Sequence, residues 1–150
     1  MTFYSETMLP DPVRHSEFYS GVAMKRGLAW IVDFVVIAAL TAVVVLFTAF
    51  LGLFFLGALF LAVGFLYRWV TISRGAGTWG MRLFGIMLLD RWGRPLDVAT
   101  ALGHTLGYTL SMAFVFPQLI SVAFMILSPR GQGLTDMVLG TVAINRPADR

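Results

Sequence analysis

The sequence predicts an all-α membrane protein with about four membrane segments, on three observations. Charged residues make up 13% of the 150 residues and apolar residues 58%, whereas soluble domains carry about 25% charged residues. Two long runs are almost free of charge, since residues 27–67 hold Asp33 alone and residues 98–127 hold no charged residue. Between them, residues 70–97 are rich in glycine, arginine and tryptophan, a composition typical of the bilayer interface.

Residues 1–24 are predicted to form a polar N-terminal arm. We expect an extended conformation there, because Pro10 and Pro12 are poor helix residues. Acids outnumber the single arginine of this arm, which is the reverse of the basic segment that opens a signal peptide. The first apolar run is therefore expected to insert as its own uncleaved signal.

The first apolar run is long enough for two membrane crossings. As one helix, residues 27–67 would measure about 60 Å, twice the roughly 30 Å of a hydrocarbon core. We therefore predict spans over about 27–47 and 51–69. No polar loop marks the turn, which we expect near residues 48–52.

Residues 70–97 are predicted to lie on the membrane as an interfacial loop that holds a short strand or an amphipathic segment. Arginine, tryptophan and glycine at this density fit the headgroup region better than a further crossing. The membrane domain is expected to continue to residue 145, and residues 146–150 to form a C-terminal tail.

The second apolar run is too short for two full crossings, which would need about 40 residues. We predict two shortened segments, 98–115 and 117–128, that form a hairpin bent near Pro117. One long tilted helix, with the C-terminal tail on the opposite side of the membrane, is the alternative. The hairpin is favoured because it keeps all basic groups on one side, as the positive-inside rule requires. These groups are Lys25 and Arg26, five arginines over 68–94, and the arginines of the tail.

Asp33 is the strongest candidate for a functional residue. A carboxylate inside a membrane helix costs roughly 2.5–3.5 kcal/mol on insertion scales, so it usually has a partner. Arg26 lies seven positions earlier, about 10 Å away along a helix, which is too far for an ordinary ion pair. His104, Tyr108 or protonation of the carboxyl are the expected ways to stabilise Asp33. We interpret it as a polar clasp that fixes helix register, with a proton- or cation-handling acid as the alternative.

Three further positions are secondary candidates. His104 is expected to be a hydrogen-bonded packing residue. Asp136 is expected to cap a short helix or to pair with Arg26 or Arg82. Gly103 and Gly107 have the spacing that lets helices approach closely, and packing within the chain is favoured over a dimer face.

Several classes of site are excluded. Without cysteine, and with only two histidines, the chain offers no metal site of the common kinds. The string Gly75-x-Gly77-x-x-Gly80 lacks the preceding strand and the βαβ unit of a dinucleotide site, and no basic cluster indicates nucleic-acid binding. No nucleophile–base pair can be assembled, so neither an enzyme nor a cofactor is expected.

The order of these features resembles the RDD family of bacterial multi-pass membrane proteins, named for one arginine and two aspartates. Arg26 and Asp33 carry the match in the first span. A loop motif carries it in the centre, with Gly77, Thr78, Gly80, Arg82 and Gly85, and Gly131-Gln132-Gly133-Leu134-Thr135-Asp136 carries it near the C-terminus. Two positions depart from the family pattern: Met81 stands where relatives usually have a base, and His104 where they tend to have an arginine.

The resemblance implies a bacterial cytoplasmic membrane protein with a cytoplasmic N-terminus. Most members have no assigned activity, although transport has been suggested and some look like cation/proton antiporters. We expect a small, non-catalytic accessory subunit that packs against a larger membrane complex or against itself. The alternative is a proton-coupled carrier of a cation or small solute that uses Asp33.

Overall fold

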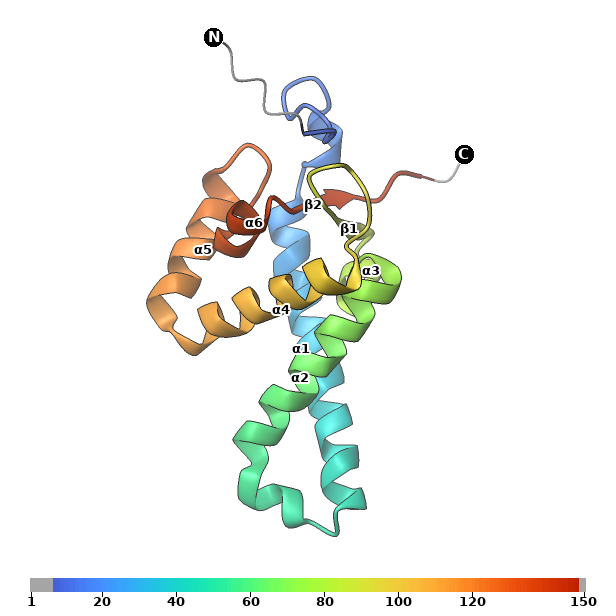
Figure 1. Ribbon diagram of the computed structural model, residues 1–150, viewed down its shortest axis with the longest axis vertical. Coiled ribbons are helices and arrows are strands. Elements are labelled where there is room, and N and C mark those ends of the chain that lie inside the picture. The colour runs from blue at the N-terminus through green and yellow to red at the C-terminus, as the bar shows by residue number, and fades with distance from the viewer. Residues whose placement is uncertain (1–6, 149–150) are drawn as a thin grey trace.

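The computed structural model describes residues 7–148 and is mostly helical (Figure 1). Six α-helices and one two-stranded sheet make up this part of the chain, with short 3-10 turns at Ser16–Phe18 and Leu51–Phe55. The helices are α1 (Val22–Phe47), α2 (Leu56–Gly75), α3 (Trp79–Leu83), α4 (Val98–Ala113), α5 (Val115–Leu127) and α6 (Leu134–Leu139). The strands are β1 (Ile86–Leu89) and β2 (Val142–Asn145).

Helices α1 and α2 form a long antiparallel hairpin. Each belongs to a stretch that is long and apolar enough to cross a membrane, Ser16–Phe47 and Leu51–Gly75. The hairpin turns where the sequence predicts a turn, and Ala49 and Phe50 take positive φ angles of 50° and 67° there. Helix α2 runs further than predicted, to Gly75, and so takes up the start of the expected interfacial loop.

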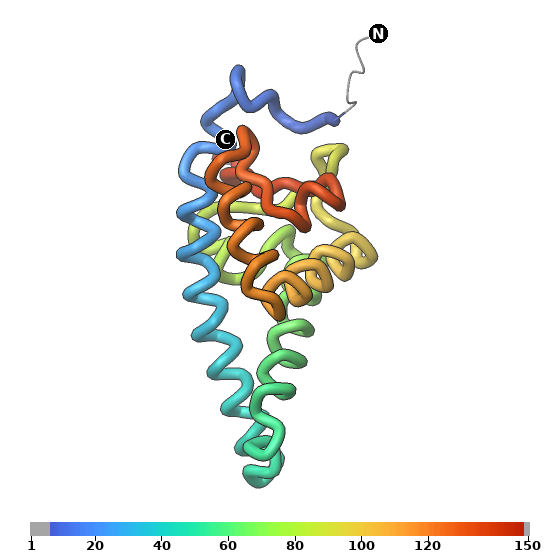
Figure 2. Tube along the Cα trace, turned by 90° about the vertical axis from the view of Figure 1, so that its left-hand side faces the viewer, coloured from blue at the N-terminus to red at the C-terminus, as the bar shows by residue number. Residues whose placement is uncertain are grey.

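The tip of this hairpin is apolar, and no other described element packs against it. Phe47 is 89% exposed and Phe54 82%, and both lie beside a turn that contains no charge. Figure 2 shows that the hairpin extends well beyond all other elements on the side away from the two termini. Apolar side chains at this exposure belong in lipid or against another membrane protein.

Helices α4 and α5 form a bent pair, with an angle of 119° between them. The predicted bend at Pro117 is wrong, because the break lies at Phe114, whose backbone is extended. Pro117 instead falls in the first turn of α5, where its missing N–H would have had no helical partner. The alternative of one straight helix over this run is also wrong. By length and composition the pair amounts to at most one broken span or a re-entrant loop, and its elbow ends well short of the hairpin tip (Figure 2).

The predicted interfacial loop is folded into the protein. It contains α3 and β1, and β1 pairs antiparallel with β2 in a register that sets Ile86 opposite Asn145. The main buried apolar cluster lies at this end of the molecule and includes Ile72, Leu88 and Ala143. Strand β2 supplies Ala143 to this cluster, so residues that follow the last predicted membrane segment help to form its core.

The N-terminal arm is only partly as expected. Residues 7–21 contain turns and the 3-10 segment, because the Asp11 carboxylate accepts hydrogen bonds from the N–H groups of Val13 and Arg14, at 2.8 and 2.9 Å. Such a local turn replaces the extended conformation that the prolines predict. Residues 1–6 of the arm and 149–150 of the tail lie outside the described part.

Candidate functional site

Asp33 lies on α1 in a complete shell of donors. It is 1% exposed, and its Oδ1 accepts hydrogen bonds from the Tyr67 hydroxyl at 2.7 Å and the Gly80 N–H at 2.9 Å. Its Oδ2 accepts a bond from the Thr78 hydroxyl at 2.6 Å. The Arg68 guanidinium lies 3.7 Å from Oδ2. The carboxylate is thus held by the Tyr67 hydroxyl and the Arg68 charge from α2, and by the turn that starts α3.

The sequence-based expectation for the partners of Asp33 is wrong, since neither His104 nor Tyr108 bonds it. Their place is taken by Tyr67, Arg68 and Thr78, for which the sequence does offer a signal. In a hairpin that turns at residues 50–51, positions 33 and 68 are equally far from the turn and therefore lie at one level. No charged residue lies between Asp33 and Arg68 in the sequence, and the hairpin brings these two charges together for this reason.

The loop motif positions the donors of Asp33. Thr78 caps α3, accepting the N–H of Met81 at 3.2 Å while its hydroxyl donates to Asp33. At Gly80 an added Cβ would press on the Ala29 carbonyl and lie 2.8 Å from Asp33 Oδ1, so only glycine allows α3 to approach α1. Arg82 donates to the carbonyls of Gly77 and Thr71 and so closes the end of α2.

Gly85 completes the loop motif at the turn between α3 and β1. Its φ of 66° is left-handed, a conformation that glycine adopts without steric cost. Its carbonyl accepts the N–H of Arg146 at 2.7 Å, which fixes the end of the chain beside this turn.

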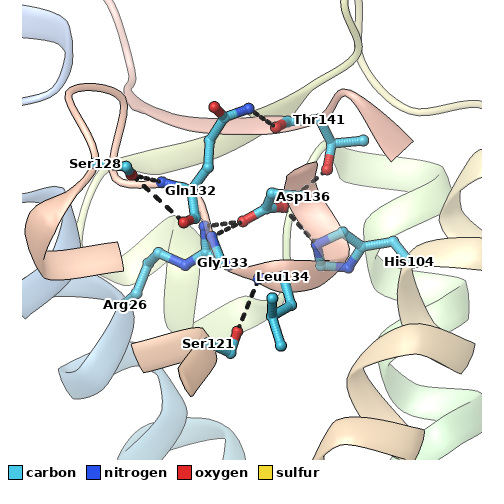
Figure 3. Close-up of polar contacts among 9 residues, drawn as sticks. All are labelled: Arg26, His104, Ser121, Ser128, Gln132, Gly133, Leu134, Asp136 and Thr141. Atoms are coloured by element: carbon cyan, nitrogen blue, oxygen red, sulfur yellow. Dashed lines mark hydrogen bonds and ion pairs between the residues drawn. The ribbon is translucent and has the colours of Figure 1, made fainter. Parts of the chain in front are cut away.

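Asp136 forms the second buried cluster (Figure 3). Its Oδ2 lies 2.7 Å from Arg26 NH1 and accepts the Gly133 N–H at 3.1 Å. Its Oδ1 lies 3.1 Å from His104 Nε2 and accepts the Thr141 hydroxyl at 2.8 Å. The two expectations for Asp136 are thus combined, because one carboxylate both caps α6 and pairs with Arg26, while Arg82 is engaged elsewhere.

The partners of Asp136 together outweigh burial in setting its ionisation. Burial alone would raise the pKa of this carboxyl, but the charge of Arg26 and the hydrogen bonds from His104 and Thr141 hold the pKa well below its ordinary 3.8. The carboxylate is therefore charged at neutral pH. An arginine–carboxylate pair in such an enclosed place is a strong and directional contact.

Acid is expected to weaken this cluster. Because the pKa of Asp136 is lower in the folded protein than in the unfolded chain, its contribution is present above about pH 4 and is lost as the pH falls further. We expect the midpoint of unfolding in detergent to drop between pH 5 and 3. The Asp136→Asn variant should show a shallower drop over the same range, and an equal drop in both proteins would contradict this assignment.

Gly103 and Gly107 face α6 within the same chain. A Cβ at Gly107 would lie 2.6 Å from the Thr135 Cγ2, and one at Gly103 would meet Leu139 at 3.6 Å. This placement agrees with the favoured interpretation, packing within the chain. His104, which follows Gly103 directly, has its Nδ1 buried without a hydrogen-bond partner in the part of the chain that the structure describes.

A cavity of about 680 Å³ joins the two clusters. Arg26 and Asp33 line it from α1, Arg68 from α2 and His104 from α4. Tyr108 also borders it, with its hydroxyl accepting the Trp30 indole N–H at 2.7 Å and its ring 4.1 Å below the Arg68 guanidinium. Tyr67, Arg68 and Thr141 are the site residues that the sequence analysis missed. Among residues 7–148 no three acids, histidines or cysteines are grouped as metal ligands.

The comparisons with known proteins agree with this geometry. The model of the RDD family matches residues 21–140, a range that contains the cavity and all residues of the two clusters except Thr141. Searches among curated proteins and solved structures give no match. With two helices of membrane length and a family match over most of its sequence, the chain is an integral membrane protein that belongs to the RDD family.

Proposed function

We propose that this protein is a small, non-catalytic accessory subunit of the bacterial cytoplasmic membrane. One observation carries the proposal: both membrane-domain acids are already satisfied within the chain. Asp33 accepts three hydrogen bonds beside Arg68, and Asp136 is held by Arg26, His104, Gly133 and Thr141. An acid that carries protons or cations needs a free oxygen in at least one state, whereas a structural clasp needs none.

The exposed apolar surface supports an interaction role. The far half of the α1–α2 hairpin stands alone (Figure 2), and the α4–α5 elbow exposes Phe114 and Phe116 at 63% and 79%. A larger membrane complex or a second copy of this chain would fit beside the hairpin, below the elbow. The proposal includes no nucleotide, nucleic acid or cofactor.

The orientation that we propose places both termini in the cytoplasm. The N-terminal and C-terminal segments lie at the same end of the molecule (Figure 1), which also carries the loop between α2 and α4. Most basic groups of the chain belong to these segments or to the adjoining ends of α1 and α2. The positive-inside rule assigns such an end to the cytoplasmic side.

A carrier is the second candidate function, favoured by the cavity that reaches Asp33 and Arg68. In this case the Asp33 clasp would open during a transport cycle, with a proton or cation replacing Arg68. Intramembrane acids and broken helices are common in carriers, and the break at Phe114 offers one.

The two functions give different outcomes for Asp33→Asn. For an accessory subunit we expect Asp33→Asn to give less folded protein in the membrane, because Arg68 loses its counter-charge. Neither the parent protein nor Asp33→Asn should carry cations or protons in proteoliposomes. Quantitative membrane immunoblotting and a gentle-detergent pull-down with native mass spectrometry measure this, with Asp97→Asn as the control. Asp97 is an exposed N-cap of α4, a position that asparagine fills equally well. The accessory role would be overturned if the parent protein carried cations or protons and Asp33→Asn abolished this flux while the amount of protein in the membrane stayed the same.

A further inference from the structure

Arg68 is a buried cation whose hydrogen-bonding capacity is unused. Its side chain is 9% exposed, and it borders the cavity. In the described part of the chain it makes an ion pair with Asp33, at 3.7 Å, and stacks on the face of the Tyr108 ring. Among residues 7–148 it donates no hydrogen bond to any acceptor, although a guanidinium carries five N–H donors. Its nitrogens are not among the buried atoms without a partner, so the free donors face the cavity, where an entering acceptor can reach them.

Asp33 does not use these donors because its oxygens are already occupied. Tyr67, Thr78 and Gly80 supply three shorter bonds, of 2.6 to 2.9 Å. Arg26 lines the same cavity and donates one hydrogen bond, to Asp136, among the described residues. Two guanidinium groups with spare donors thus face one cavity. Arginine is the side chain best suited to bind carboxylate and phosphate oxygens.

Apart from a few hydroxyl and amide groups, such as those of Ser111 and Gln118, the rest of the cavity is apolar, and it opens between α1 and α5. Met81, Met112 and Met125 are among its lining residues, and methionine adapts to flexible apolar ligands. Its border also includes Met24 and Ile126, which are 74% and 68% exposed. Helix α5 packs on α4 and α6 rather than closely on α1, which leaves this side open. The volume of about 680 Å³ lies in the range of small-molecule sites.

We propose that this cavity binds an anionic headgroup carried on an apolar chain. The carboxylate or phosphate oxygens accept hydrogen bonds from Arg68, and the apolar chain lies along the methionines and leaves between α1 and α5. The depth agrees with this assignment, because α1 begins at the end of the molecule that carries both termini (Figure 1). A lipid of that leaflet has its headgroup at the level of Arg26 and its chain directed toward the elbow.

The test blocks the cavity without replacing a residue of either cluster. A Cβ at Gly27 meets no atom within 4 Å, and Gly27 lines the cavity, so Gly27→Trp fills the opening without a backbone clash. Gly57 on α2 is matched to it, because its Cβ also meets nothing within 4 Å and it is remote from the lining residues. Gly57→Trp is therefore the control for adding an indole to a lipid-facing helix.

Binding is measured by native mass spectrometry of detergent-purified protein titrated with phosphatidylglycerol, oleate, phosphatidylcholine or inorganic phosphate. We expect phosphatidylglycerol or oleate to bind the parent protein and Gly57→Trp equally, and Gly27→Trp at least about tenfold more weakly. Arg68→Gln should also lose about tenfold, the effect of removing one charge-assisted contact. Whichever of the two lipids binds more tightly identifies the headgroup as phosphate or carboxylate.

Three results would overturn the proposal. The first is equal lipid binding by Gly27→Trp and the parent protein when both melt at the same temperature. The second is equal binding of phosphatidylcholine and phosphatidylglycerol. The third is full competition by inorganic phosphate alone, which would reveal a plain anion site that does not use the apolar walls.

Discussion

Asp136→Asn is expected to destabilise the protein by about 3–5 kcal/mol, the range measured when one partner of a buried ion pair is removed. Asparagine keeps the size of the side chain but leaves Arg26, whose side chain is 10% exposed, with an uncompensated charge. It also leaves one carbonyl oxygen where the carboxylate has two, so the contacts of Arg26 and Gly133 with Oδ2 and those of His104 and Thr141 with Oδ1 cannot all be kept. The measurement is unfolding in detergent, followed by tryptophan fluorescence, against Asp97→Asn as the surface control.

A double variant separates the lost charge balance from the lost shape. Arg26→Gln combined with Asp136→Asn removes both charges, so we expect it to be more stable than Asp136→Asn alone. If the two single changes add without any coupling, the ion pair is not what holds α1 to α6. An effect of Asp136→Asn no larger than that of Asp97→Asn would contradict the cluster altogether.

Gly80→Ala is expected to cost about 1–3 kcal/mol, the usual range for overpacking a tight interface. The added methyl group would press on the backbone carbonyl of Ala29, and backbone cannot rotate out of the way. Helix α3 would have to move from α1, which lengthens the Gly80 N–H bond to Asp33. Thermal unfolding in detergent measures the loss.

Two other glycines calibrate this result. Gly57→Ala places its Cβ in open space and should be neutral or slightly stabilising, because alanine favours the helix. Gly107→Ala should fall between the two, since its Cβ would meet the movable side chain of Thr135. If Gly80→Ala and Gly57→Ala unfold at the same temperature, α3 is not held as closely to α1 as the structure requires.

Length and composition predict the α1–α2 hairpin because a bilayer limits how long an apolar helix can be. The turn follows from halving the run, and α1 indeed ends at Phe47. The sequence analysis named Arg26 and Arg82 as possible ion-pair partners of Asp136. Arg26 could be named because the positive-inside rule places its segment and that of Asp136 at one membrane level. The hairpin and the shared level of Arg26 and Asp136 depend on the thickness and sidedness of the bilayer more than on particular side-chain contacts.

The parts that the sequence does not predict depend on side-chain pairing over long separations. Asp33 was given the wrong partners because the level of Tyr67 and Arg68 depends on the exact turn position, and no polar loop marks that turn. Strands β1 and β2 have four residues each, too few for a periodic signal, and their partners are far apart in the chain. The bend at Phe114 was misplaced because proline can begin a helix as well as break one.

The long separation between Arg26 and Asp136 sets the order in which the protein is completed during synthesis. The bonded partners of Asp33 all lie within 47 positions of it, so the hairpin clasp can close while the ribosome is still translating. Asp136 comes 110 positions after Arg26, a delay of roughly 5–20 s at ordinary rates of translation. Until then the nascent protein holds a cation without its counter-charge and a cavity without its last wall. A chain cut short before residue 136 would therefore lose its closing piece and be exposed to membrane proteases.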